Sequence, residues 1–189
     1  MLSLNPGDIG SKNEFGLCIV PSSFSGSRKS GDFEWEIRKN IRPTALYLFN
    51  DNVEHHTSSS KGGGNAAIRP WNQFGRERPV RSAGIPTGTM TGGGFTSLSD
   101  AKQHVDAAIG EVEVLLSSGM YDTVVYSCVS KNDDALGTGI FQVATEVKDY
   151  IRNRIYGLGK TYRTDSICSS NNVDTVNNVR MDDGDKRIE

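Results

Sequence analysis

Three short segments of this 189-residue chain combine residue types that suit phosphates and sugars. The first reads Asn50-Asp51-Asn52, the second Lys61-Gly62-Gly63-Gly64-Asn65, and the third Gly137-Thr138-Gly139-Ile140-Phe141. A glycine run leaves backbone N–H groups uncovered, so that it can wrap a phosphate, and a helix that begins there adds aligned donors. Asn and Asp side chains can hydrogen-bond a ribose or the edge of a base. Together the segments predict a pocket for a nucleotide-type anion.

The residues expected to line this pocket come from these segments and from one strand end. Residues 82–88 have small side chains that let a ligand or a neighbouring loop approach closely, and they contribute Thr87. The predicted ligand-binding residues are Asn50, Asn52, Gly62, Gly63, Gly64, Asn65, Thr87, Gly137, Thr138, Gly139, Ile140 and Phe141. If the pocket is catalytic, Asn52, Asn65 and Asp51 are the candidates to orient a water molecule. Each segment also has a plainer interpretation as a turn, a linker, a packed strand or a helix start.

The spacing of other reactive residues excludes several familiar kinds of site. The glycine run is not a P-loop, because no Gly-Lys-Ser/Thr follows it, and the chain has no GxGxxG dinucleotide fingerprint. His55 and His56 are adjacent and point apart, whereas a metal pair usually lies on one face. The cysteines have no CxxC or Cys/His spacing, so Cys18 and Cys128 are expected to be reduced core residues. We therefore expect neither a metal site nor a cofactor.

Strands that alternate with helices position these segments. We expect strands over residues 16–21, 44–49, 80–86 and 123–129. Apolar residues repeat at three and four over residues 98–116 and predict an amphipathic helix that Ser97 or Ser99 caps. A second predicted helix begins at Ala144 and ends before Gly157, whereas residues 33–40 fit either a strand or a short helix. The pattern predicts a three-layer α/β domain with ligand loops at the ends of its strands.

Composition narrows the class of protein. The formal net charge is −2, so no overall field draws the protein to nucleic acid, and we expect no bulk nucleic-acid binding. No apolar run is long enough to span a membrane and no signal-peptide pattern begins the chain, which favours a soluble cytoplasmic protein without a membrane partner. We expect one domain over residues 1–159, with its core in 44–155, and a polar tail over 160–189.

The chain resembles the macrodomain superfamily in four motifs that follow one another in the same order. These are the Asn-containing strand end, the glycine/alanine helix start, the Ile85-Pro86-Thr87 strand end and the segment that begins at Gly137. The closest likeness is to small macro-like proteins of phages and bacteria, and it covers about residues 44–155. The resemblance implies a mixed central sheet with helices on both faces. It also implies that the asparagine segment (Asn50, Asn52) and the first glycine run hold the distal ribose side of ADP-ribose, and that the second glycine segment holds the diphosphate. Asp32 is the candidate counterpart of the aspartate that contacts adenine.

Three functions are compatible with this sequence. The first is a module that binds ADP-ribose or a related cyclic or signalling nucleotide, and sequesters it. The second is an enzyme on the same fold, either an ADP-ribosyl hydrolase or an ADP-ribose phosphatase. The hydrolase pattern, with asparagines at a set spacing before the glycine run, is not reproduced. The third is a structural or interaction protein whose glycine segments only make tight turns.

Overall fold

Four parallel strands form the centre of the structure, in the order β1 (Cys18–Ser22), β5 (Thr123–Ser130), β2 (Ala45–Asn52) and β3 (Ser82–Thr89). The short strands β4 (Gly93–Gly94) and β6 (Asp133–Leu136) pair antiparallel with β3 and β5. This computed structural model describes residues 16–130, 132–138 and 142–161. The expected α/β fold class with a mixed sheet is therefore confirmed for the described residues.

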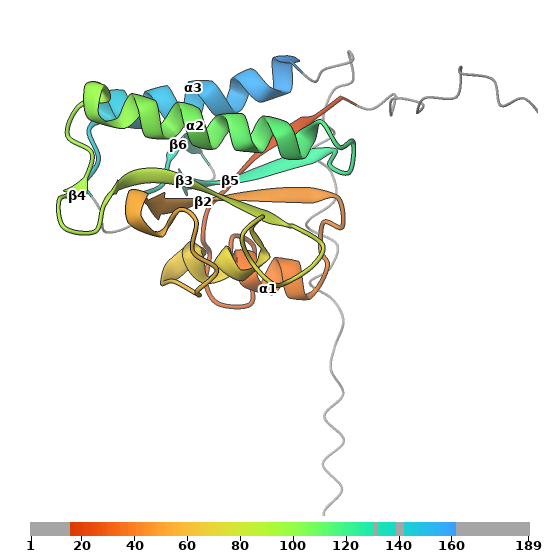
Figure 1. The fold of residues 1–189 in the computed structure, drawn as a ribbon. Helices are drawn as coiled ribbons and strands as arrows, with labels where there is room; N and C mark the ends of the chain where they lie inside the picture. The colour runs from red at the N-terminus through yellow and green to blue at the C-terminus, as the bar shows by residue number, and fades with distance from the viewer. Residues whose placement is uncertain (1–15, 131, 139–141, 162–189) are drawn as a thin grey trace, which may run out of the picture.

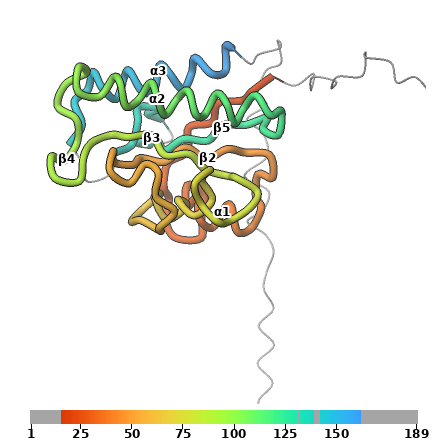
Figure 2. Tube along the Cα trace, in the orientation of Figure 1, coloured from red at the N-terminus to blue at the C-terminus, as the bar shows by residue number. Residues whose placement is uncertain are grey.

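Helices lie on both faces of this sheet. The helices α2 (Leu98–Leu116) and α3 (Thr145–Thr161) run side by side over one face, which we call the α2–α3 face (Figure 1, Figure 2). The short helix α1 (Phe33–Arg38) and the 3₁₀ helix η2 (Gly64–Trp71) lie on the other, the α1–η2 face (Figure 1). A second 3₁₀ helix, η1 (Val53–His55), directly follows β2.

Strand β2 packs into both apolar cores because successive side chains of a strand point to opposite faces. Leu46 and Leu48 belong to the large core beneath α2 and α3. Tyr47 and Phe49 belong to the smaller core that contains Ile68 of η2. The buried run of β2 is consequently apolar without alternation, as expected for a strand covered on both sides.

Within residues 33–40, for which the sequence allowed either a strand or a short helix, Phe33–Arg38 form the helix α1. Asp32 caps it, since its Oδ1 accepts the N–H of Trp35 at 3.1 Å. The buried Glu36 accepts the Gly31 N–H at 2.8 Å and the Tyr47 hydroxyl at 3.0 Å. Burial, followed by the charge of Glu36, raises the pKa of the Tyr47 hydroxyl. The helix is favoured because it brings this carboxylate to the donors it needs inside the core.

Three predicted element ends are wrong by three residues or more. Strand β2 does not end at Phe49 but continues through Asn52, because residues 50–52 still pair with β3. Strand β3 does not end at Pro86: a proline removes only its own N–H, and pairing with β2 resumes at Gly88 after a register shift. Helix α3 runs through Gly157 and Gly159 to Thr161, because Leu158 is buried and the bare Gly159 lies close to Ile19. The predicted tail, except for the first residues that complete α3, lies outside the described residues.

The cysteines correct one further expectation. Cys128 is free and buried, as predicted, and burial raises the pKa of its thiol. Cys18 is disulfide-bonded, so the expectation of a reduced thiol at that position is wrong.

A pair of glycine substitutions tests this packing. An added Cβ at Gly88 would lie 2.0 Å from the Gly93 carbonyl oxygen, whereas one at Gly110 in α2 meets nothing within 4 Å. We expect Gly88→Ala to lower the free energy of unfolding by about 1–3 kcal/mol, as overpacking does. Gly110→Ala should raise it by about 0.5–1 kcal/mol through helix propensity. Urea denaturation of both variants measures the difference, and equal stabilities would contradict the close approach of β3 and β4.

Candidate functional site

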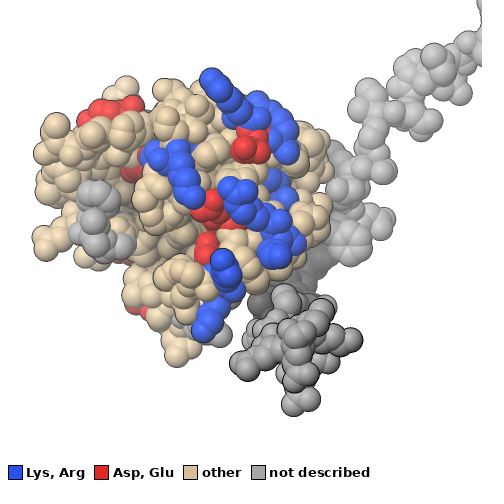
Figure 3. Space-filling view, turned by 90° about the horizontal axis from the view of Figure 1, so that it is seen from below, with Lys and Arg blue, Asp and Glu red and all other residues tan. Residues whose placement is uncertain are grey.

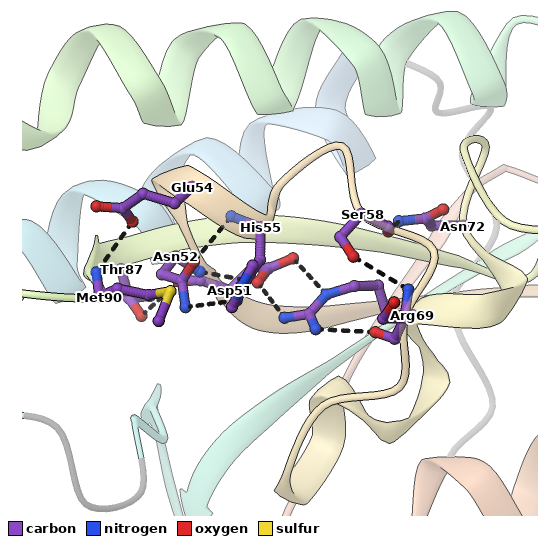
Figure 4. A network of polar contacts seen from close by, with 10 residues as sticks. Asp51, Asn52, Glu54, His55, Ser58, Arg69, Asn72, Thr87 and Met90 are labelled. Atoms are coloured by element: carbon purple, nitrogen blue, oxygen red, sulfur yellow. Dashed lines mark hydrogen bonds and ion pairs between the residues drawn. The ribbon is translucent and has the colours of Figure 1, made fainter.

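A buried ion pair lies at the carboxyl end of β2. Nη2 of Arg69 is 2.5 Å from Oδ1 of Asp51, and Nε donates to Oδ2 at 3.3 Å (Figure 4). The side chain of Arg69 is 6% exposed and that of Asp51 is 0% exposed. Because an isolated charge is very costly to bury, each of these groups depends on the other.

The backbone of β3 makes room for this pair. Gly84 is the register partner of Phe49, and an added Cβ there would lie 2.7 Å from Oδ2 of Asp51. The guanidinium of Arg69 lies 5.9 Å from the centre of the Phe49 ring. Glycine at position 84 is therefore required by a side chain on the neighbouring strand, rather than by a turn.

Arg69 also fixes the segment that enters the first glycine run. Its Nη1 donates to the carbonyl of Ser60 at 3.0 Å, and Asn72 donates to the carbonyl of Ser58 at 3.1 Å (Figure 4). An added Cβ at Gly62 would lie 2.9 Å from that same Nη1, so only glycine fits where the loop passes Arg69. The N–H of Gly62 donates to the carbonyl of Ala66 at 3.0 Å. Gly62 thus serves the internal packing of the loop.

Gly63 and Gly64 have a different environment. Both are exposed, and an added Cβ at either would meet nothing within 4 Å. Among the described residues, no acceptor faces their backbone N–H groups. Asn65 is half-buried in the first turn of η2, and no described residue hydrogen-bonds its side-chain amide. Gly63 and Gly64 therefore expose backbone donors at the start of η2, and no described residue engages the amide of Asn65 beside them.

Lys61 begins the glycine run and ties it to α1. Its Nζ lies 2.7 Å from one oxygen of Glu34 and 2.9 Å from the other. The hydrogen bond from Lys61 lowers the pKa of the Glu34 carboxyl, and burial opposes it. Both side chains are partly exposed, so this pair orients the rim of the loop and contributes little stability.

Asn50 holds the second glycine segment. Its Nδ2 donates to the carbonyl of Gly137 at 2.5 Å, across 87 residues of sequence. The N–H of Gly137 donates to the carbonyl of Ser127 at 3.0 Å, and an added Cβ would lie 2.7 Å from the Cys128 carbonyl oxygen. Thr138 is buried beside it. The predicted ligand residues Gly139, Ile140 and Phe141 lie outside the described residues.

The two glycine segments leave the sheet on opposite faces. After β2 the chain passes to η2 on the α1–η2 face, and after β5 it passes through β6 to α3 on the α2–α3 face. Strands β2 and β5 are neighbours in the sheet. In open α/β sheets a crevice forms where adjacent strands send their connections to opposite faces. At this point Asn50 contacts Gly137, whereas Asp51, the next residue of β2, binds Arg69, which contacts Ser60 directly before the first glycine run.

Other predicted site residues support the end of β2. Asn52 caps η1 by accepting the His55 N–H at 2.9 Å, and its own N–H donates to Oδ1 of Asp51 at 2.8 Å (Figure 4). Thr87 is buried, and its hydroxyl donates to the carbonyl of Asp51 at 3.3 Å. Asp32 accepts the backbone N–H groups of Arg28 and Trp35. These polar atoms are engaged by the protein itself.

The histidines take up separate positions. Nδ1 of His55 lies 3.3 Å from the Asn52 amide, whereas Nε2 of His56 lies 2.9 Å from Glu111 of α2, which Gln73 also contacts at 2.7 Å. In the part of the chain that the structure describes, no three His, Cys, Asp or Glu side chains gather closely enough to hold a metal ion. None of the described helices has the length and apolar character needed to cross a membrane.

The chain after β3 is held against η1. Oε2 of Glu54 accepts the backbone N–H of Met90 at 2.9 Å (Figure 4). This donor lowers the pKa of the exposed Glu54 carboxyl. The lowered pKa means that the carboxylate form, which makes the contact, persists to more acidic pH than for an ordinary glutamate.

Arg69 is the residue that sequence reasoning missed. Its neighbours Ala66, Ala67, Ile68 and Trp71 form an otherwise apolar segment, in which an arginine requires a buried partner. That signal predicts a buried acid, but it does not identify Asp51, which lies 18 residues earlier.

Comparison with known proteins supplies no relative: no family model, no curated protein and no solved structure matches the chain.

Substitution of Arg69 tests the ion pair. We expect Arg69→Met to lower the free energy of unfolding by about 3–5 kcal/mol, because it leaves the Asp51 carboxylate buried without a partner. The double variant Asp51→Leu/Arg69→Met should recover part of this loss, because no uncompensated charge remains. Denaturant unfolding of the variants measures both effects. A single variant as stable as the unmodified protein would contradict a structural role for the pair.

Proposed function

We propose that this chain is a macro-like module that binds ADP-ribose or a related cyclic or signalling nucleotide through its glycine-rich segments, and so sequesters it. The observation that carries the proposal is the anchoring of two glycine segments by consecutive residues of β2. Asn50 contacts Gly137, and Asp51 reaches the first glycine run through Arg69. A diphosphate between the segments would accept hydrogen bonds from backbone N–H groups, as anions do at such loops.

The arrangement of helices on both faces of a mixed sheet is compatible with the three-layer architecture of macro-like proteins. The resemblance of the motifs is the source of the ligand class. The exposed N–H groups of Gly63 and Gly64, together with the amide of Asn65, supply donors that would suit phosphate and ribose oxygens.

Binding is favoured over hydrolysis by the state of the candidate catalytic residues. Asp51 is buried against Arg69, so its carboxylate cannot take a proton from water at the rim. The side-chain oxygen of Asn52 caps η1. Asn65 remains as the candidate whose side chain no described residue engages, and an amide alone is not a general base.

Gly63→Val separates ligand binding from a purely structural role. Gly63 has φ −82° and open space around its Cα, so valine fits the folded chain, but its side chain would cover the neighbouring N–H groups. We expect the variant to keep the melting temperature within about 2 °C and to lose at least tenfold in affinity, which is about 1.4 kcal/mol. Calorimetric titration with ADP-ribose, NAD and cyclic ADP-ribose isomers measures the affinity.

Gly110→Val is the matched control, since it adds the same side chain to α2 in equally open space. It should bind like the unmodified protein. No heat of binding for any of these nucleotides at about millimolar concentration would refute the proposed function.

Asn65→Ala tests the enzymatic alternative. We expect the unmodified protein to release no ADP-ribose from an ADP-ribosylated protein or oligonucleotide and no phosphate from ADP-ribose 1″-phosphate, as followed by chromatography. Asn65→Ala should weaken nucleotide binding about fivefold or more, through the loss of a hydrogen bond. Product formation by the unmodified protein that disappears in a folded Asn65→Ala variant would favour the hydrolase instead.

A further inference from the structure

The charged side chains of the described residues are segregated between the two faces. On the α1–η2 face, residues 24–42 and 61–81 expose the cations Arg28, Lys29, Arg38, Lys39, Lys61, Arg76 and Arg78. Arg38 and Lys61 both pair with the partly buried Glu34, and no salt bridge is found for the other five among the described residues. In these two fully described segments Glu77 is the one exposed acid. Seen from this side, Lys and Arg side chains form a band across the surface, and some acidic side chains lie within it (Figure 3).

The α2–α3 face has the opposite character. Its described residues expose the acids Asp100, Asp133, Asp134 and Glu146. Lys102 and Lys160 are also exposed there, and the Nζ of Lys102 is 2.5 Å from Asp106. The described residues carry equal numbers of basic and acidic side chains, and these are distributed unevenly between the two faces. A patch of one sign attracts a polyanion locally even when the whole protein is slightly acidic.

A hollow with an aromatic wall lies within this basic surface. It has a volume of about 310 Å³ and is lined by Arg28, Asp32, Glu34, Trp35 and Arg38. Trp35 is half-buried and lines the hollow together with two arginines and two acids. Both acids are engaged by the protein, since Glu34 pairs with Arg38 and Asp32 accepts the N–H groups of Arg28 and Trp35. The guanidinium carbon of Arg38 lies 5.0 Å from the centre of the Trp71 ring, so the two side chains make a cation–π contact.

We propose that the α1–η2 face binds single-stranded nucleic acid, with its cations on successive phosphates and a base stacked on Trp35. A positively charged surface that combines cations with an accessible aromatic ring is the arrangement that single strands require. Duplex reading usually needs an element that protrudes into a groove, whereas α1 has six residues and packs its Phe33 and Ile37 into the core. This proposal replaces the expectation, based on net charge alone, of no nucleic-acid binding, and it is independent of the nucleotide pocket.

Fluorescence anisotropy with the full chain tests the proposal. The probes are fluorescein-labelled oligothymidylate and oligouridylate of about 20 nucleotides, titrated between about 50 and about 200 mM NaCl. We expect binding to both single strands, weaker binding to a duplex of equal length, and loss of affinity with salt. The variant Lys39→Gln/Arg76→Gln should lower the slope of log K against log salt by about 1.4, which is two contacts at about 0.7 each.

The matched control is Lys148→Gln/Lys160→Gln on α3, which removes the same charge from the other face and should leave the affinity within about twofold. Trp35→Leu should weaken binding by about fivefold to 150-fold, whereas Trp35→Phe, which keeps a ring, should lose much less. Thermal melting confirms that the variants are folded.

Three outcomes would overturn the inference. One is no anisotropy change at about 50 mM NaCl with about 100 μM protein. A second is that Lys39→Gln/Arg76→Gln and Lys148→Gln/Lys160→Gln weaken oligonucleotide binding equally, because the net charge of the protein, and not this face, would then determine the affinity. A third is tighter binding to polyglutamate than to either oligonucleotide, which would indicate an acidic protein partner. Nucleotide binding in the pocket is measured separately, so either result leaves the other proposal open to its own test.

Discussion

The rest of the candidate site depends on one buried ion pair. Asp51 lies near the end of the buried strand β2, and Arg69 of η2 reaches it there, where neither charge is accessible to water. An ion pair in such surroundings must be satisfied completely, and this requirement selects the residues around it. Gly84 leaves space for the carboxylate and Gly62 leaves space for the guanidinium. Ser60 supplies the carbonyl that accepts a further N–H of Arg69.

This constraint turns a flexible sequence into a defined loop. Residues 56–63 are rich in serine and glycine, and nothing in their local propensity fixes a conformation. Arg69 in η2 donates a hydrogen bond to the carbonyl of Ser60, and Asn72, directly after η2, donates one to the carbonyl of Ser58. Gly63 and Gly64 then follow as open positions at the start of η2. A preorganised anion site needs backbone N–H groups that are exposed and held in place by a fixed loop, and Gly63 and Gly64 meet this requirement.

The same strand end links the two faces of the molecule. Side chains alternate along β2, so Asn50 faces the second glycine segment while Asp51 faces η2. The two segments lie on opposite faces because β5, which lies between β1 and β2, sends its connection to the α2–α3 face, whereas β2 sends its own to the α1–η2 face. The basic residues lie on the α1–η2 face because α1, η2 and their loops cover this side of the sheet. The sequences of these segments carry most of the unpaired cations of the described residues.

The sequence by itself determined the elements whose apolar pattern is strong. Helix α2 begins and ends as its periodicity predicts, and Ser97 caps it. The strands β2 and β5 follow from their buried runs, and the fold class follows from the alternation of strands and helices. The glycine segments were also visible as unusual composition. Each of these features depends on neighbouring residues, so local physics suffices to recognise it.

Only the tertiary structure decided which residues act together. Asp51 and Arg69 are 18 residues apart, and Asn50 and Gly137 are 87 apart, so no local pattern pairs them. The choice between strand and helix for residues 33–40 depended on Tyr47 and Gly31, which supply donors to Glu36. The end of α3 depended on contact with Ile19 at the other end of the chain. In each case a buried group required a partner, and only the folded chain determined which partner was within reach.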